Sequence, residues 1–134
     1  MTFVGTDIVK NIRFDRWLRF SDAQLLRVFH PQEVAQFRVL LANDTHRATQ
    51  FLASRFAVKE AFFKAYFSAA SSLRLQQLLR YPFLSLAHRL CALSQHGPVE
   101  LFLDTPFELP FSYQVSLAHE GCCSVATVLL CLKE

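Results

Sequence analysis

Three places in the sequence carry charged or titratable side chains where the hydrophobic pattern predicts none. Asp7 lies inside an apolar run that reads as a short buried strand, and such a carboxylate must be exposed, paired or bound to a cation because burying it alone is costly. Glu60 and Lys64 are four residues apart in a helical pattern, so they share one helix face. His119 directly follows a strand-like run. Carboxylates beside a lysine could hold a divalent cation against a phosphate.

Each of these places also has a purely structural interpretation. Glu60 and Lys64 could form a surface ion pair that contributes about 0.3 kcal/mol. A histidine at a strand end is usually solvated or capping. The four cysteines form no C-x-x-C pair, so a zinc site or a disulfide framework is a poor fit. The glycine-rich phosphate loops of P-loop and Rossmann enzymes and the G-x-S-x-G motif of hydrolases do not occur.

The elements that must position these residues are helices in the middle of the chain and strands at both ends. The long helix has no Gly or Pro to interrupt it, and the last two strands are close enough in sequence to form a hairpin. This arrangement predicts an α+β fold with a sheet packed against the long helix. The expected segments are a strand in Met1 to Ile12, one or two short helices in Arg13 to Phe29, a helix from Gln32 to Leu41, a helix from His46 to about Ala70, and strands at Pro98 to Leu103, Tyr113 to Ala118 and Cys123 to Leu132.

Length and composition indicate one ordered domain, residues 1–134. Hydrophobic residues make up 52 % of the 134 residues and charged residues 19 %, which excludes wholesale disorder. No apolar run reaches the roughly 18 residues of a membrane span, and no signal peptide is recognisable, so we expect a cytoplasmic protein without membrane insertion. The net charge is +3, but residues 1–89 hold 13 Lys and Arg against 6 Asp and Glu. This excess predicts an anionic partner: nucleic acid, a phosphorylated metabolite or an acidic protein.

Taken in order, three segments resemble the holo-acyl-carrier-protein synthases, the small single-domain phosphopantetheinyl transferases. Val4-Gly5-Thr6-Asp7-Ile8 matches the family pattern G-x-D-[IV], and Val115-Ser116-Leu117-Ala118-His119 matches V-S-[IL]-[ST]-H except at Ala118. The segment from Phe51 to Ala65 matches F-[LA]-[AS]-x-R-[FW]-[AS]-x-K-E-A-x-x-K-A and is the specific one. The family's Gly-rich stretch after this motif is replaced by residues 67–73, which contain no Gly.

The resemblance implies a reaction and a set of site residues. The family transfers 4′-phosphopantetheine from coenzyme A to a serine of apo-acyl carrier protein and releases adenosine 3′,5′-bisphosphate. By the resemblance, Asp7 and Glu60 hold Mg²⁺, and Lys64 meets the reacting phosphate. The other implied assignments are coenzyme A binding by His46, Arg47, Arg55, Lys64 and His119, and carrier-protein binding by Arg13, Arg16, Arg19 and Arg27.

The resemblance also implies a shared active site. Larger relatives build one site between two tandem copies of a domain of this length. A single copy would then need His119 from a neighbouring subunit, and we expect a homotrimer with three interfacial sites. Two other hypotheses remain: a degenerate homologue that binds coenzyme A or carrier protein without transfer, suggested by the missing glycines, and a small basic RNA-binding domain. The second is disfavoured because most of the aromatic residues are Phe at core-like spacings, so we expect no nucleic-acid partner.

Overall fold

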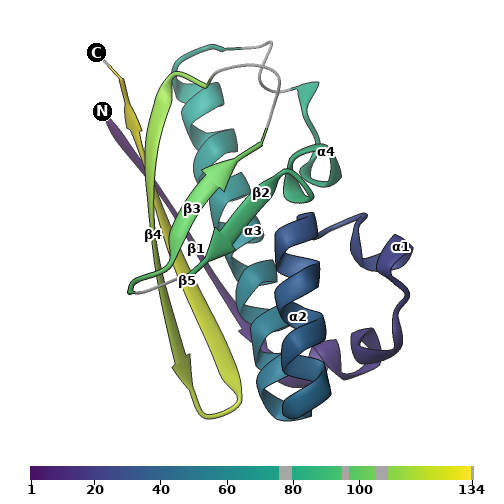
Figure 1. Cartoon of the computed structure of the whole chain (residues 1–134). Helices are drawn as coiled ribbons and strands as arrows, with labels where there is room; N and C mark the ends of the chain where they lie inside the picture. The colour runs from purple at the N-terminus through teal and green to yellow at the C-terminus, as the bar shows by residue number, and fades with distance from the viewer. Residues whose placement is uncertain (76–79, 95–96, 105–108, 134) are drawn as a thin grey trace.

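The computed structural model describes residues 1–75, 80–94, 97–104 and 109–133, and its elements form an α+β fold (Figure 1). The helical elements occupy the middle of the chain and the longest strands lie at its ends, as the sequence predicts. The elements in chain order are β1 (Thr2–Lys10), the 3₁₀ helix η1 (Asn11–Arg19), α1 (Asp22–Leu25), α2 (Pro31–Asn43), α3 (Thr45–Ser72), α4 (Phe83–Ala87), β2 (Leu90–Leu93), β3 (Glu100–Leu103), β4 (Phe111–Glu120) and β5 (Cys123–Leu132).

The main sheet is antiparallel and has the strand order β1-β5-β4. β4 and β5 form the expected hairpin, and β1 pairs along the other edge of β5. The register places Asp7 opposite Ala126 and Val9 opposite Ser124, while His119 faces Ser124 from β4. β2 and β3 form a separate two-stranded sheet. Asp7 and His119 are therefore carried by the two outer strands, with β5 between them.

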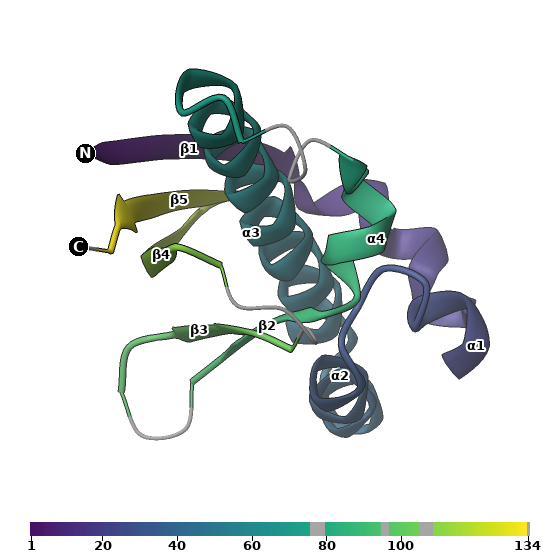
Figure 2. The same cartoon turned by 90° about the horizontal axis from the view of Figure 1, so that it is seen from above.

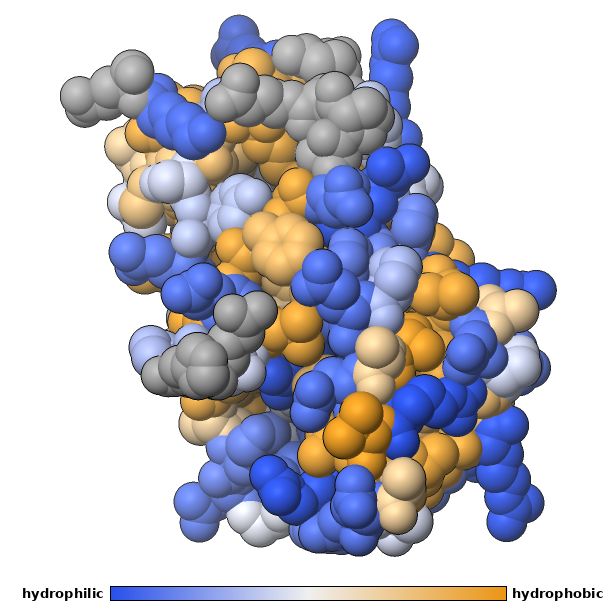
Figure 3. All heavy atoms as spheres, in the orientation of Figure 1, coloured by the Kyte–Doolittle hydropathy of each residue, from blue (hydrophilic) through white to orange (hydrophobic). Residues whose placement is uncertain are grey.

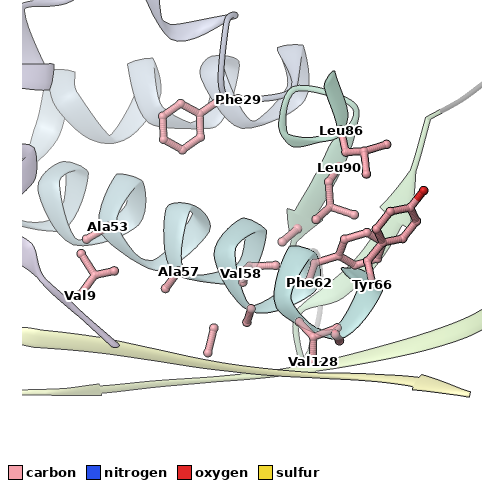
Figure 4. Close-up of a cluster of buried hydrophobic side chains, with 14 of the residues drawn as sticks. Val9, Phe29, Ala53, Ala57, Val58, Phe62, Tyr66, Leu86, Leu90 and Val128 are labelled. Carbon is pink, nitrogen blue, oxygen red and sulfur yellow. The ribbon is translucent and has the colours of Figure 1, made fainter. Parts of the chain in front are cut away.

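Helix α3 crosses one face of the sheet and contributes more residues to the hydrophobic core than any other element (Figure 2). Figure 4 shows its apolar side chains between the sheet residues Val9 and Val128 and the residues Phe29, Leu86 and Leu90 of other elements. The contact with β1 is closest at Gly5, where an added Cβ would lie 1.8 Å from the carbonyl oxygen of Ala61. Only a residue without a side chain fits there.

Capping side chains and a proline mark the starts of the three helices α1, α2 and α3. Ser21 forms a capping box with Gln24 at the start of α1, Pro31 is the first residue of α2, and the Asp44 carboxylate accepts from the Arg47 amide at the start of α3. On the face of the molecule that carries α2, α4 and the β2–β3 pair, apolar and polar side chains are interspersed (Figure 3). None of the described helices is long and apolar enough to cross a membrane.

The structure adds two elements that the sequence pattern does not predict, α4 and β2. Both are short, with five and four residues, and neither is long enough to show a periodicity. The strand expected from Pro98 begins at Glu100, because proline cannot donate a ladder hydrogen bond. Helix α3 continues through residues 67–72, which contain no Gly to end it.

Candidate active site on the two flanks of helix α3

One cluster of charged residues lies where α3 meets the outer edge of β1. The ammonium of Lys64 is 2.9 Å from Asp7 Oδ1 and also donates to the carbonyl oxygen of Thr6, 3.1 Å away. The Lys64 side chain is 53 % exposed and that of Asp7 is 17 % exposed, so the pair faces solvent from a partly enclosed position. Lys64 of α3 thus forms an ion pair with Asp7 of β1, and the cluster contains residues of both elements.

Glu60 completes this cluster one helical turn before Lys64. Partial burial raises the pKa of the Glu60 carboxyl, and the negative charge of Asp7 raises it further, while Lys64 and Arg13 act in the opposite direction. A carboxylate whose charged form is disfavoured by a second carboxylate is a position where an added cation would be stabilising. Two partly exposed carboxylates fit a hard divalent ion that takes its other ligands from phosphate and water.

A second cluster lies on the opposite flank of α3, in a pocket of about 250 Å³. Its lining includes Arg47, Gln50, Arg55 and His119, with Phe51 and Leu93 among the apolar residues. The guanidinium of Arg55 donates to the Ala92 carbonyl at 2.9 Å and stacks on the Phe51 ring, 4.3 Å from its centroid. Burial lowers the pKa of Arg55, yet this side chain stays charged at physiological pH. The pocket therefore offers fixed positive charge to an anionic ligand.

Helix geometry keeps the two clusters apart within one chain. Arg55 and Glu60 are five residues apart, which places them about 140° apart around the helix axis. His119 belongs to the Arg55 side: burial and the positive charge of Arg55 both lower the pKa of its imidazole. The fold thus brings Asp7, Glu60 and Lys64 together and brings Arg47 and Arg55 to His119, but it does not join the two groups.

His46 is separated from its neighbour Arg47. His46 lines a different pocket of about 380 Å³, together with Asn11, Asp15 and Cys122. Adjacent residues on a helix point about 100° apart, so the pair expected to serve one ligand diverges.

The arginines expected to bind a carrier protein are all exposed to solvent. Residues three apart eclipse one another along a 3₁₀ helix, so Arg13, Arg16 and Arg19 follow one face of η1, and all three are exposed. Arg27 is exposed in the turn after α1. Burial raises the pKa of Glu60 and the positive charge of Arg13 opposes this, so the first arginine of the row lies near the carboxylate cluster.

Sequence reasoning missed a buried ion pair on α3. The Lys59 ammonium is 2.6 Å from Glu33 Oε1, and the two side chains are 1 % and 0 % exposed. Glu33 also accepts from the amides of His30 and Ala92, and burial lowers the pKa of Lys59 while Glu33 raises it. The signal that could have found the pair is Glu33 three residues after His30, the spacing of a capping box.

Comparison with known proteins gives one family. The model of the 4′-phosphopantetheinyl transferase superfamily matches residues 3–126. The holo-[acyl-carrier-protein] synthase of Geobacter sulfurreducens is 33 % identical over 130 residues, covering 94 % of each chain. That of Bordetella pertussis is 40 % identical over 63 residues, 46 % of this chain and 41 % of the relative. In several of these relatives, including those of Bordetella pertussis and Treponema pallidum, the chain matches only about half of the relative's length.

A solved structure shares the fold over the whole chain. The complex of a holo-acyl-carrier-protein synthase with coenzyme A from Chronobacterium ammoniagenes has a TM-score of 0.71 and covers 100 % of this chain and 99 % of its own. At 24 % identity, this likeness establishes the fold. It confirms the α+β architecture that the sequence predicts.

Proposed function

The chain belongs to the 4′-phosphopantetheinyl transferase superfamily, and from this membership we propose that it transfers 4′-phosphopantetheine from coenzyme A to a serine of an apo-acyl carrier protein. The products would be holo-acyl carrier protein and adenosine 3′,5′-bisphosphate, which places the reaction in fatty acid biosynthesis. A cytoplasmic location fits these substrates. The observation that carries the proposal is the convergence of Asp7, Glu60 and Lys64 from two elements, in the positions where the family motifs fall.

The carboxylate cluster fits a magnesium ion. Asp7 and Glu60 would hold it, and its charge would offset the partial burial and the negative charge of Asp7, which together raise the pKa of Glu60. When bound, Mg²⁺ would neutralise the pyrophosphate of coenzyme A.

The chain's own side chains have distinct parts in this reaction. The serine oxygen of the carrier protein would form a bond to the β-phosphorus and release its proton to solvent water. The bond from that phosphorus to the bridging oxygen would break, and the oxygen would leave with the electron pair as part of adenosine 3′,5′-bisphosphate. Lys64 sits at the end of the cluster with an exposed ammonium that can leave Asp7 for a phosphoryl oxygen. Arg47, Arg55 and His119 would bind the nucleotide phosphates, because they form a positive pocket. Such a displacement depends on alignment and charge neutralisation.

The exposed arginines of η1 would dock the carrier protein. Carrier proteins of this kind are acidic around the target serine, and Arg13, Arg16 and Arg19 present a row of guanidinium groups beside the carboxylate cluster. Arg27 lies beyond them on the same exposed segment of the chain. This placement would bring the serine to the ion-binding side of α3.

A mass measurement tests the proposed reaction. The protein is incubated with coenzyme A, Mg²⁺ and apo-acyl carrier protein, and the carrier is weighed by mass spectrometry. We expect a gain of one phosphopantetheine arm on the serine, and no gain when the metal is removed with a chelator. Binding of coenzyme A without any mass gain would instead support the non-catalytic homologue, which the missing glycines suggest. Binding of RNA that weakens steeply with salt would support the third hypothesis.

The separation of the two clusters supports a site shared between subunits. Since Arg55 and His119 occupy the flank of α3 opposite Glu60, one ligand would contact both groups only if a second subunit supplied one of them. The face of the sheet turned away from α3 gives such a subunit a surface, because Val4 and Ile8 of β1 are 57 % and 64 % exposed there. A homotrimer closes this head-to-tail contact.

Complementation between inactive subunits tests the shared site. His119→Ala and Glu60→Ala proteins are mixed under conditions that allow subunit exchange. Some mixed interfaces then combine an intact His119 with an intact Glu60, so we expect activity to return in part. A monomer by light scattering, or no recovery after exchange has been demonstrated by differential labelling, would exclude the shared site.

A further inference from the structure

His119 is tied to the interior by a short chain of hydrogen bonds. Its Nδ1 lies 3.0 Å from the hydroxyl of Ser124, and the same hydroxyl lies 2.7 Å from the Oδ1 atom of Asn11. The three residues come from β4, β5 and the first position of η1. Ser124 is completely buried and Asn11 is 7 % exposed. The chain thus runs from the core to a side chain that lines the Arg47–Arg55 pocket.

With the Asn11 amide oriented so that Oδ1 faces Ser124, as in this structure, a count of hydrogen atoms gives the form of the imidazole. A serine hydroxyl has a single hydrogen, and Ser124 donates it to Asn11 Oδ1, an atom that can only accept. The contact between Ser124 and His119 then needs a hydrogen on Nδ1. A neutral imidazole carries only one N–H, so Nε2 is left with a free lone pair. Nε2 is at the far side of the ring from Ser124.

Asn11 brings into the interior a polar group that the described residues leave without a partner. Within the described residues its Nδ2 is buried and has no hydrogen-bond partner. An unsatisfied buried donor is destabilising, and an apolar residue of similar size would avoid it. The one side-chain hydrogen bond that Asn11 accepts is the bond from Ser124. Since Asn11 lowers stability and its side chain accepts only the bond from Ser124, we infer that this bond has a functional role.

We propose that Asn11 and Ser124 are positioning residues that hold His119 as the Nδ1–H tautomer, with Nε2 directed at the phosphate of a ligand in the Arg47–Arg55 pocket. The identity of the ligand rests on the proposed function, whereas the tautomer does not. When a phosphate binds, Nε2 takes up one proton from solvent, keeps it, and donates a hydrogen bond through it to a phosphate oxygen. The Nδ1–H bond to Ser124 is the same before and after this step, so the ring does not have to turn.

Nuclear magnetic resonance tests the tautomer directly on the ligand-free protein. Two-bond ¹H–¹⁵N correlations at a pH well above the imidazole titration distinguish Nδ1–H from Nε2–H, and His119→Ala identifies the signal. We expect Nδ1–H for the wild type. In Ser124→Ala the acceptor is gone, and in Asn11→Leu the Ser124 hydroxyl is free to donate to Nδ1. Both variants should therefore change to Nε2–H.

A second serine of the sheet supplies the matched control. Ser116 is exposed on β4, three residues before His119, and Ser116→Ala should leave the Nδ1–H signal unchanged. An Nε2–H signal in the wild type would mean that Ser124 donates to His119, and it would overturn the proposal. An unchanged Nδ1–H signal in both Ser124→Ala and Asn11→Leu would also overturn it.

Ligand binding tests the second part of the proposal, that Ser124 strengthens phosphate binding through His119. Calorimetry with adenosine 3′,5′-bisphosphate should show about three- to tenfold weaker binding for Ser124→Ala than for wild type, the effect of one lost hydrogen bond. In a His119→Ala background the same substitution should have no effect. Equal weakening in both backgrounds would show that Ser124 does not act through His119. Absence of binding to the wild type would contradict the proposed function and leave the tautomer result standing.

Discussion

Two lysines of helix α3 are each paired with a carboxylate from another element, and the pairs differ in solvent exposure. Lys59 and Glu33 are 1 % and 0 % exposed, and the carboxylate has backbone amides as further partners. Lys64 and Asp7 are 53 % and 17 % exposed, and Glu60 adds a second carboxylate beside them. The buried pair satisfies its charges inside the protein, whereas the exposed pair leaves charge available to a ligand. The difference is consistent with a structural role for the buried pair, and it supports the proposed role of the exposed pair in activity.

The largest effect is expected from removal of either carboxylate of the exposed cluster. Glu60→Ala and Asp7→Ala should each lower the transfer rate by about 100-fold or more, because loss of a direct metal ligand costs several kcal/mol of transition-state stabilisation. The melting temperature should change little. Retention of more than about a tenth of the wild-type rate by either variant would remove the metal-site assignment.

Breaking the buried Glu33–Lys59 pair should instead lower the stability of the fold. Lys59→Met leaves the Glu33 carboxylate buried without its counter-ion, and we expect a loss of about 3–5 kcal/mol in the free energy of unfolding. Chemical denaturation measures this loss. Lys64→Met is the matched control, since its partner remains in contact with solvent, and it should cost less than about 1 kcal/mol while lowering activity. Equal destabilisation by Lys59→Met and Lys64→Met would show that the buried pair contributes no more to stability than the exposed pair.

The fold was largely predictable because its signals are local. Uninterrupted helical periodicity and the Asp44 cap predict α3, which spans Thr45–Ser72, and alternation with turn residues predicts the β4–β5 hairpin. The motif residues of the exposed cluster were predictable from the family resemblance. The Glu33–Lys59 pair was not, because its partners are far apart in sequence and both look like surface residues of amphipathic helices. The contact between Ser124 and Asn11, 113 residues apart in sequence, is hidden for the same reason.

A smaller effect is expected at the edge of the exposed cluster. Arg16→Glu should raise the apparent KM for carrier protein about tenfold and reduce its salt dependence, because it reverses a charge in the η1 row. The KM for coenzyme A should stay constant. Arg80→Glu, at an exposed arginine elsewhere, is the control. A weakened affinity for coenzyme A with unchanged carrier dependence would count against the docking surface.

The smallest expected effect is a gain in stability. Folding raises the pKa of Glu60, so its charge opposes folding above that pKa, and the penalty disappears as the pH falls through it. Glu60→Gln should therefore stabilise the protein at neutral pH, by at most about 0.5 kcal/mol because solvent screens the group. Thermal unfolding at pH 7 and pH 4 should show the difference from wild type narrowing at the lower pH. A destabilised Glu60→Gln protein at neutral pH would contradict this electrostatic account.

The close approach of β1 to α3 at Gly5 also limits which substitutions the carboxylate cluster can tolerate nearby. Asp7 sits two residues from the point where the backbones of β1 and α3 touch, so the spacing between its carboxylate and α3 is fixed by an absent side chain. Each of the other nineteen amino acids would place a carbon against the Ala61 carbonyl and force the strand and helix apart. Substitution is thus excluded at Gly5, whereas exposed arginines such as Arg16 and Arg19 could change to suit a different acidic partner without disturbing the contact between β1 and α3.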